Sequence, residues 1–339
     1  MDLICPGCRR FDTSTGVSDA RVNSAGQCVR CGIQYPVVDG VMCLAPDVPT
    51  FLEAQSWALT SDWLGSVGDD LSANMCDLDS YERFERALTA MYAEAHYPVN
   101  FKVAGGQKVL FSQLLNQNED TLWKLVGQIL NHTSQSNCVR FLDVGCGPGG
   151  LVSRVASIAK TWQCVGFDLR VAALRVAARL NTGGRFTLSC RVEGNRFVDA
   201  VVEPPRHRAS SVTWVQGDLF NPPFRGESFD VIAAMSFLDT FPNPWFGLGQ
   251  LDALLRPGGL LVLATPYHWE PTVVPEERWF CKTGVSSEQV VRSALGGESS
   301  DMLDLNYEIV SQSELPWALP AGHRLVHVYG LDVVVARKR

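Results

Sequence analysis

Long apolar runs are missing from this chain of 339 residues. No stretch of about 18 consecutive apolar residues occurs, so we expect neither a membrane-spanning helix nor a membrane partner. The opening residues, MDLICPGCRR, also lack the apolar core of a secretory signal peptide. These two absences predict a cytoplasmic protein.

An excess of positive charge is missing as well. Lys and Arg number 29 against 36 Asp and Glu, which gives a net charge of −7. The chain therefore has no overall basic field that would attract nucleic acid, although a local basic patch stays compatible with this composition. Hydrophobic residues make up 46% of the chain and charged residues 19%, as is typical of soluble globular proteins.

Cysteine is abundant and unevenly placed. Four of the eleven cysteines form two C-x-x-C pairs near the start, Cys5 with Cys8 and Cys28 with Cys31. In a reducing compartment such pairs indicate metal ligands rather than disulfides. A segment of about forty residues cannot bury enough core to hold itself, so a bound metal ion would supply the missing folding energy. The scattered cysteines, which have apolar neighbours, are expected to be small buried hydrophobes.

The stretch LICPGC…QCVRCGIQYPVVDGVMCL resembles a small zinc-ribbon domain, which occurs alone as a methyltransferase activator or fused to the front of some methyltransferases. The resemblance covers residues 2–44. It implies a structural Zn²⁺, because four protein thiolates leave no coordination position open for catalysis. We predict a zinc ribbon over residues 1–45, with the metal ligands Cys5, Cys8, Cys28 and Cys31.

Residues 46–130 predict a helical linker or lid. DLDSYERFERALTAMYAEAHY spaces its apolar residues at three- and four-residue steps, as one face of a helix does. A second helix is predicted in DTLWKLVGQILNH, with Asp120 as its N-cap. The pair His96-Tyr97 falls at the end of the first helix, where it would either pack in the core or line a site.

FLDVGCGPGG, residues 141–150, predicts a buried strand, a bare turn and the start of a helix. Glycines in such a turn let a ligand lie against the backbone at the helix N-terminus. Gly145, Gly147 and Gly150 also fit the dinucleotide pattern G-x-G-x-x-G, and Asp168 follows about twenty residues later. The glycine spacing alone is therefore also compatible with a nicotinamide cofactor.

The next segments favour a different cofactor. QCVGFDLR and SVTWVQGDLF end two strands on acids, FDVIAAMSFLDTF predicts a fourth strand, and LLRPGGLLVLATP predicts a fifth. In this order, over residues 138–266, they resemble class I S-adenosylmethionine-dependent methyltransferases. The resemblance implies an α/β fold with a Rossmann-like seven-stranded sheet over residues 131–339, and S-adenosyl-L-methionine as cofactor.

Acids at the ends of neighbouring strands can grip one nucleoside. Asp143 would reach the cofactor's ammonium, Asp168 the ribose hydroxyls and Asp218 the exocyclic amine of adenine. The candidate cofactor-binding residues are Asp143, Gly145, Cys146, Gly147, Gly149, Asp168, Leu169, Gly217, Asp218, Leu219 and Met235.

The later half of the chain resembles the methyltransferase domain of ovothiol biosynthesis, which methylates an imidazole nitrogen of mercaptohistidine. The most specific segment is PYHWEPTVVPEERWF, residues 266–280, an uncommon continuation after a fifth strand. No N/D-P-P-Y/F follows the fourth strand, where many enzymes that methylate exocyclic amines carry it. The resemblance implies a small histidine-derived substrate, such as mercaptohistidine or a related thiol or selenol histidine.

Four residues after the fourth and fifth strands are candidates for catalysis: Tyr267, Asp239, His268 and Glu270. Tyr267 or Asp239 would orient an imidazole N–H, and Glu270 would pair with a substrate ammonium or act as a base. His268 would shape the acceptor pocket or only cap the strand.

Two alternatives stay open. Zinc ribbons are also fused to ribosomal RNA methyltransferases, so an rRNA or tRNA substrate is the second hypothesis. A non-catalytic methyltransferase-like scaffold is the third, which the three intact acids argue against. The oligomeric state is not indicated by any pattern.

Overall fold

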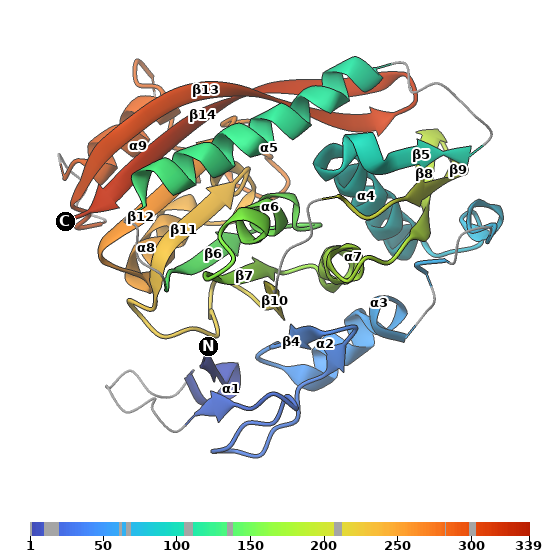
Figure 1. Ribbon diagram of the computed structural model, residues 1–339, viewed down its shortest axis with the longest axis horizontal. Helices are drawn as coiled ribbons and strands as arrows, with labels where there is room; N and C mark the ends of the chain where they lie inside the picture. Colours follow the sequence, from blue (N-terminus) through green and yellow to red (C-terminus); the bar gives the residue numbers. More distant parts are fainter. Residues whose placement is uncertain are drawn as a thin grey trace.

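A mixed nine-stranded sheet forms the centre of the computed structural model, which describes residues 2–9, 20–60, 63–65, 69–104, 111–133, 138–206, 212–281, 283–297 and 303–339 (Figure 1). The strand order is β13-β14-β12-β11-β6-β7-β10-β4-β3. The strands are β3 (Val37–Val38), β4 (Val41–Cys43), β6 (Arg140–Val144), β7 (Gln163–Asp168), β10 (Val212–Gln216), β11 (Phe229–Met235), β12 (Leu255–Thr265), β13 (Tyr307–Gly322) and β14 (Leu325–Lys338).

Seven of these strands form the predicted Rossmann-like sheet. β10, β7, β6, β11 and β12 run parallel, and β14 lies antiparallel between β12 and β13. From β6 the chain passes to β7 and β10 on one side, and then to β11 and β12 on the other. The strand order therefore reverses beside β6, which is where open α/β sheets bind their ligands. The α/β fold expected from the sequence is confirmed.

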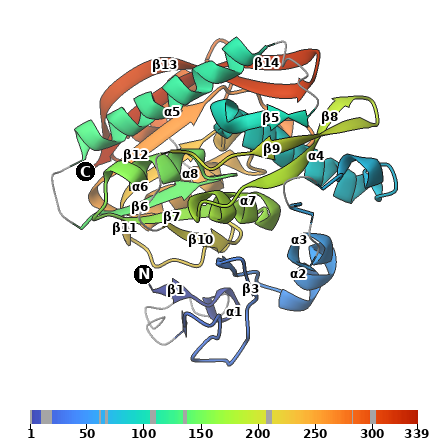
Figure 2. The same ribbon diagram turned by 45° about the vertical axis from the view of Figure 1, so that its right-hand side comes forward.

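The sheet is two strands wider than the sequence predicted, because the N-terminal segment contributes to it. β4 pairs in parallel with β10, with Val41 opposite Trp214, and β3 pairs antiparallel with β4. The chain before them forms β1 (Leu3–Ile4), the short helix α1 (Pro6–Arg9) and β2 (Arg21–Val22). Figures 1 and 2 show this blue segment beneath the β10 edge. The predicted ribbon is thus joined to the main sheet by backbone hydrogen bonds.

Two hydrophobic cores cover the two faces of the sheet. The helices α4 (Ser80–His96), α5 (Ser112–His132), α6 (Gly150–Ile158) and α7 (Val171–Asn181) pack on one face, and α8 (Pro244–Leu254) and α9 (Ser287–Leu295) pack on the other. The central strands are buried on both faces, which explains their continuous apolar sequences. In both views α5 lies along the β13–β14 hairpin (Figures 1 and 2).

The helical region contains both predicted helices, but the second begins earlier than predicted. α4 is capped by Asp79, whose carboxylate accepts from two backbone N–H groups. α5 begins at Ser112, so the prediction of Asp120 as an N-cap was wrong. Asn118 explains why the predicted start of this helix was too late. It is a polar residue on the buried face of α5, where it bonds the backbone of Ala95 and Ala318, and it interrupts the apolar period.

Smaller elements complete the described chain. α2 (Val48–Ala54) and α3 (Ser56–Thr60) follow the N-terminal segment, and β5 (Phe101–Val103), β9 (Arg196–Val202) and β8 (Phe186–Glu193) form a separate three-stranded sheet. Short 3-10 turns lie at Ser72–Asn74, Pro98–Asn100, Leu238–Thr240 and Glu276–Arg278. Within the described ranges, no helix combines the length and apolarity needed to cross a membrane.

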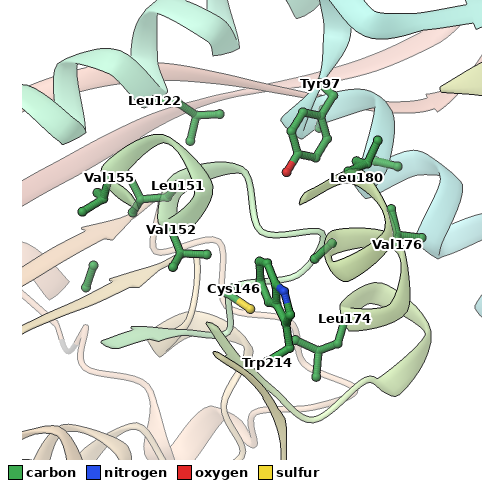
Figure 3. Close-up of a cluster of buried hydrophobic side chains, with 14 of the residues drawn as sticks. Tyr97, Leu122, Cys146, Leu151, Val152, Val155, Leu174, Val176, Leu180 and Trp214 are labelled. Carbon is green, nitrogen blue, oxygen red and sulfur yellow. The ribbon is translucent and has the colours of Figure 1, made fainter. Parts of the chain in front are cut away.

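The turn between β6 and α6 needs a bare backbone. Gly145, Gly147 and Gly149 have φ values of 68°, 52° and 80°, the left-handed region that glycine adopts without a steric cost. A Cβ on Gly149 would lie 2.5 Å from the indole of Trp214. Figure 3 shows this indole beside Cys146, within the cluster of apolar side chains from α6 and α7. The backbone of this turn therefore packs directly against the hydrophobic core.

We predict that Gly149→Ala destabilises the protein by more than Gly258→Ala. Both positions have positive φ, so each alanine costs about 1–2 kcal/mol of backbone strain. Only Gly149 is crowded, since nothing lies within 4 Å of a Cβ at Gly258. Overpacking against Trp214 should add about 1–3 kcal/mol to the loss. Urea unfolding of the two variants measures the difference, and equal losses would contradict the packing argument.

Candidate functional site

A cavity of about 420 Å³ lies at the carboxyl ends of β6, β7, β10 and β11. It occupies the position where the strand order reverses, and its size is within the range of about 300–1,000 Å³ typical of small-molecule sites. The predicted cofactor residues that line it are Asp143, Gly145, Cys146, Gly147, Asp168, Leu169, Gly217, Asp218, Leu219 and Met235. Gly149 does not line it, because it packs against Trp214 instead.

Asp143 lies buried at the end of β6, and one of its two carboxyl oxygens has no hydrogen-bond partner in the described part of the chain. Its Oδ2 accepts from Val152 N–H on α6 at 3.2 Å. Within the described ranges, its Oδ1 has no hydrogen-bond partner. Burial raises the pKa of this carboxyl to about 8, and the nearby charge of Asp168 adds to the rise. A cation in the cavity would therefore gain from pairing with Asp143 and would ionise it.

Asp168 ends β7 and fixes the glycine turn. Its Oδ2 accepts from Gly147 N–H and its Oδ1 from Arg170 N–H, both at 2.8 Å. Burial is the main cause that raises its pKa, and these two hydrogen bonds oppose the rise. A carboxylate offers about four acceptor positions, so Asp168 keeps room for further donors such as sugar hydroxyls.

The third acid of the cavity, Asp218, follows β10. Its Oδ1 accepts from Phe220 N–H at 2.9 Å, which curls the chain so that Leu219 and Phe220 both line the cavity. The Phe220 ring stacks on Phe241 with centroids 4.7 Å apart. An acid beside an apolar and aromatic surface is suited to a flat, amine-bearing ring such as adenine.

The sequence had left His96 undecided and had not predicted Tyr92 or Trp317 as site residues, but all three line the cavity. Tyr92 and His96 lie one turn apart on α4, and Trp317 comes from β13. His96 and Trp317 meet edge to face at 5.4 Å. The aromatic pair His96-Tyr97 at a helix end was the one sequence feature that pointed to this wall of the cavity. The pairing of α4 with β13 is a long-range contact that no local pattern indicates.

His96 fixes the N-terminus of α6 and is held neutral. Gly150 N–H donates to its Nδ1 at 3.1 Å, and a Cβ at Gly150 would lie 2.5 Å from that atom. Burial, with the charge of Arg154 as a second cause, lowers the pKa of His96 to about 3. Since Nδ1 accepts, the neutral ring carries its proton on Nε2, the nitrogen nearer to Gly147.

The buried guanidinium of Arg154 ties three helices together behind the turn. It pairs with Glu119 of α5, donates to Gly150 O at 2.7 Å, and donates to His96 O at the end of α4. Its guanidinium also lies 5.6 Å from the centre of the Tyr97 ring, whose hydroxyl donates to Pro148 O at 2.9 Å. The backbone around the glycine turn is thereby held from two sides.

None of the four predicted catalytic residues lines the cavity. Asp239 is buried and accepts from His268 N–H at 2.9 Å and from the Thr265 hydroxyl at 3.2 Å. Tyr267 donates its hydroxyl to Asp332 at 3.0 Å. The structure thus groups these residues around the loops that follow β11 and β12, and direct contact with an acceptor stays a prediction.

The other two members of this group are more accessible. The exposed His268 ring lies 5.4 Å from the ring of Tyr329. Glu270 accepts from the backbone and hydroxyl of Thr272, and these two bonds lower its pKa. Glu270 is therefore a carboxylate at neutral pH, turned toward its own loop.

The four predicted metal ligands come together. The Sγ atoms of Cys5, Cys8, Cys28 and Cys31 all lie within 4.8 Å of one another. Cys5 and Cys31 are 3.7 Å apart, and Cys8 and Cys28 are 3.9 Å apart. A tetrahedral Zn²⁺ with Zn–S bonds of about 2.3 Å places its sulfurs about 3.8 Å apart, so the cluster fits that ion. The Tyr35 hydroxyl lies 3.0 Å from Cys5 Sγ and supports this ligand from outside.

Residues 142–263 match the family model described as a methyltransferase domain. The chain contains a class I S-adenosylmethionine-dependent methyltransferase domain. Curated relatives include the phthiotriol/phenolphthiotriol dimycocerosates methyltransferases of Mycobacterium ulcerans, 28% identical over 123 residues, and of Mycobacterium leprae, 29% identical over 126 residues. The alignments cover 36% and 37% of this chain and the same shares of the relatives, so the chain spans little more than a third of their length.

Solved structures with a low likeness to the chain include two methyltransferases. Magnesium protoporphyrin IX methyltransferase from Synechocystis has a TM-score of 0.45 at 13% identity, and the match covers 77% of this chain and 98% of that one. An S-adenosylmethionine-dependent methyltransferase from Methanosarcina mazei has a TM-score of 0.41 at 17% identity, covering 62% and 96%. Likenesses this low indicate neither a substrate nor the role of any residue.

The cysteine cluster rests on the methyltransferase domain beside its third acid. Ile4 N–H donates to Pro223 O at 2.9 Å, Arg9 donates to Phe224 O at 2.6 Å, and Asn221 donates to Pro6 O at 3.0 Å. These partners belong to residues 221–224, the loop that continues from Asp218. The cluster therefore supports one wall of the cavity.

We predict that Cys28→Ser loses its zinc and that Cys281→Ser keeps it. The first change removes one of four thiolates. The second removes a cysteine outside the cluster, which is exposed and not buried as the sequence predicted. Elemental analysis of the purified proteins should find about one zinc per chain in the wild type and in Cys281→Ser. Thermal melting should fall only in Cys28→Ser, because the metal contributes folding free energy. Equal zinc contents in the two variants would contradict the assignment.

Proposed function

We propose that this protein transfers a methyl group from S-adenosyl-L-methionine to an imidazole nitrogen of a small histidine-derived substrate. Mercaptohistidine and related thiol or selenol histidines are the first candidates. The observation that supports the transfer best is the cavity itself, in which three acids and a bare glycine turn line the carboxyl ends of neighbouring strands. The resemblance of residues 266–280 to the ovothiol methyltransferase domain supports the choice of acceptor.

The residues present suit the cofactor. Asp143 has a free acceptor oxygen for an ammonium, Asp168 has spare acceptor positions for ribose hydroxyls, and Asp218 with Leu219 offers an edge and a face for adenine. Gly145 and Gly147 line the cavity without side chains, so the methionine part can lie directly against the backbone of the positive-φ turn. When bound, S-adenosylmethionine supplies a methyl carbon made electrophilic by the adjacent sulfonium.

The acceptor side of the cavity is walled by aromatic rings. Phe237 follows β11, and Tyr92 and Trp317 face the same cavity from α4 and β13. Flat rings pack favourably against such walls. The basic side chain among the lining residues, Arg170, is bound to Glu85 at 2.7 Å, so it is not available for a phosphate. These features support a small acceptor with a flat, neutral ring over a nucleic acid.

The protein's main contribution to the reaction is then to position the acceptor nitrogen relative to the methyl group. A neutral imidazole nitrogen would use its lone pair to form the N–CH3 bond while the S–CH3 bond breaks and neutral S-adenosylhomocysteine leaves. The resulting methylimidazolium would release its N–H proton to a base or to water. In this proposal Asp239 and Tyr267 hold the loops after β11 and β12. His268 and Glu270 lie outside the cavity lining, so their contact with the polar groups of the substrate requires these loops to move toward the cavity. Most of the acceleration would come from aligning the nitrogen with the methyl carbon.

The proposal is tested with S-adenosylmethionine that carries a labelled methyl group. The purified protein is incubated with mercaptohistidine, its selenol analogue, free histidine and ribosomal RNA in parallel. We expect label in the histidine thiol or selenol, on a ring nitrogen when the product is mapped by NMR. Transfer to RNA alone would replace this function with the RNA hypothesis, and binding of the cofactor without any transfer would favour a scaffold.

We predict that the binding of S-adenosylhomocysteine at pH 7 releases a proton, and that Asp143→Asn abolishes most of this release. Because burial raises the pKa of Asp143 to about 8, the free protein holds this carboxyl largely protonated at pH 7. The ligand's ammonium favours the carboxylate, so affinity should rise with pH up to about 8. Calorimetry in two buffers of different ionisation enthalpy counts the protons. An equal release by Asp143→Asn would contradict this role.

A further inference from the structure

A second cavity, of about 220 Å³, lies between α4, β8 and the end of β13. It shares no lining residue with the cofactor cavity, because α4 turns a different face to each. Tyr92 and His96 face the cofactor cavity, whereas Met91 and Glu94 face the second one. The apolar side chains that line it are Phe84, Ala87, Leu88, Met91, Val103, Phe111, Leu115, Val192, Val198, Pro320, Ala321 and Val326.

Glu94 places a single carboxyl group among these apolar side chains. Within the part of the chain that the structure describes, this carboxyl group makes neither a hydrogen bond nor an ion pair. Arg191 lines the same cavity, but its guanidinium donates to Gly194 O at 2.6 Å. His323 also lines it, where its backbone N–H donates to Val192 O at 3.0 Å and joins β13 to β8.

A carboxylate without a partner in an apolar cavity is costly, because burial removes water from the charged form. Burial raises the pKa of Glu94 to about 7. A positively charged donor in the cavity would recover this cost, whereas a second anion would add to it. The size is also sufficient for a ligand, since an apolar protein cavity of about 150 Å³ is enough to bind benzene.

We propose that this cavity is a second binding site, which takes a small apolar molecule bearing one ammonium group. The ammonium pairs with the Glu94 carboxylate, and the apolar part packs against Leu88 and Met91 of α4 and Val198 of β9. The proposal is independent of the acceptor proposed above, because the two cavities lie on different faces of α4.

Benzylamine is a suitable probe, since it joins a benzene-sized body to one ammonium. Binding is followed by NMR of protein labelled at its methionine methyl groups, which are assigned with Met91→Leu and Met235→Leu. Met91 lines the second cavity and Met235 lines the cofactor cavity, so the two sites report separately. We expect benzylamine to shift the Met91 signal with a millimolar or lower Kd, and to leave the Met235 signal in place.

Two variants and one matched control test the role of the carboxyl group. Glu94→Gln should weaken benzylamine binding at least tenfold, and Ala87→Phe should abolish it by filling the cavity. Glu53→Gln removes an equal charge from the exposed surface of α2 and should leave the Kd unchanged. Thermal melting verifies that each variant is folded, and Leu88→Phe replaces Ala87→Phe if the latter is not.

Benzyl alcohol and benzoate separate charge recognition from simple apolar binding. Benzyl alcohol should bind at least tenfold more weakly than benzylamine, and benzoate should not bind. The proposal is overturned if benzylamine does not shift Met91, if Glu94→Gln binds it as tightly as the wild type, or if benzyl alcohol binds equally well. A shift of Met235 in place of Met91 would also overturn it.

Discussion

The close approach of the β6–α6 turn to the side chains around it is the constraint on which this site depends. Trp214 of β10 leaves no room for a Cβ at Gly149 or at Gly166 of β7, and His96 leaves none at Gly150. The glycines therefore do two things at once. They give the backbone its left-handed turn, and they let two aromatic side chains lock that turn to β10 and α4.

The N-terminal segment extends this support to the Asp218 side of the cavity. β4 adds to the sheet edge beside β10, Leu44 N–H donates to Gln216 O at 2.9 Å, and the cysteine cluster holds the loop after Asp218. A metal ion here would organise a segment whose strands have only two or three residues. Because that segment contacts the cavity wall directly, the ribbon is best understood as part of the methyltransferase framework.

Sequence patterns were most informative where the chemistry is local. A buried strand that ends on an acid or a glycine turn is a short-range signal, and it placed Asp143, Asp168 and Asp218 at one cavity. The C-x-x-C pairs located the metal cluster for the same reason. The pairing of β4 with β10 escaped notice because a strand of three residues carries little pattern, and the pairing joins positions far apart in the chain.

The loops after β11 and β12 show the limit of such reasoning. Tyr267, Asp239, His268 and Glu270 follow the expected strands, but their directions are set by distant partners such as Asp332. The walls of the cavity come instead from Tyr92 and Trp317, which only the packing of α4 against β13 brings together. Asn118 is a buried polar residue of α5 that accepts a hydrogen bond from β13. Because it interrupts the apolar pattern, the start of α5 at Ser112 could not be predicted from that pattern.

The central claim is that three strand-end acids and a bare turn hold one sulfonium nucleoside. The most direct measurement is a crystal structure of the protein with S-adenosylhomocysteine. The account predicts the ribose hydroxyls on Asp168, the adenine beside Asp218 and Leu219, and the ammonium on Asp143. A ligand bound elsewhere, or an empty cavity at saturating concentration, would contradict it.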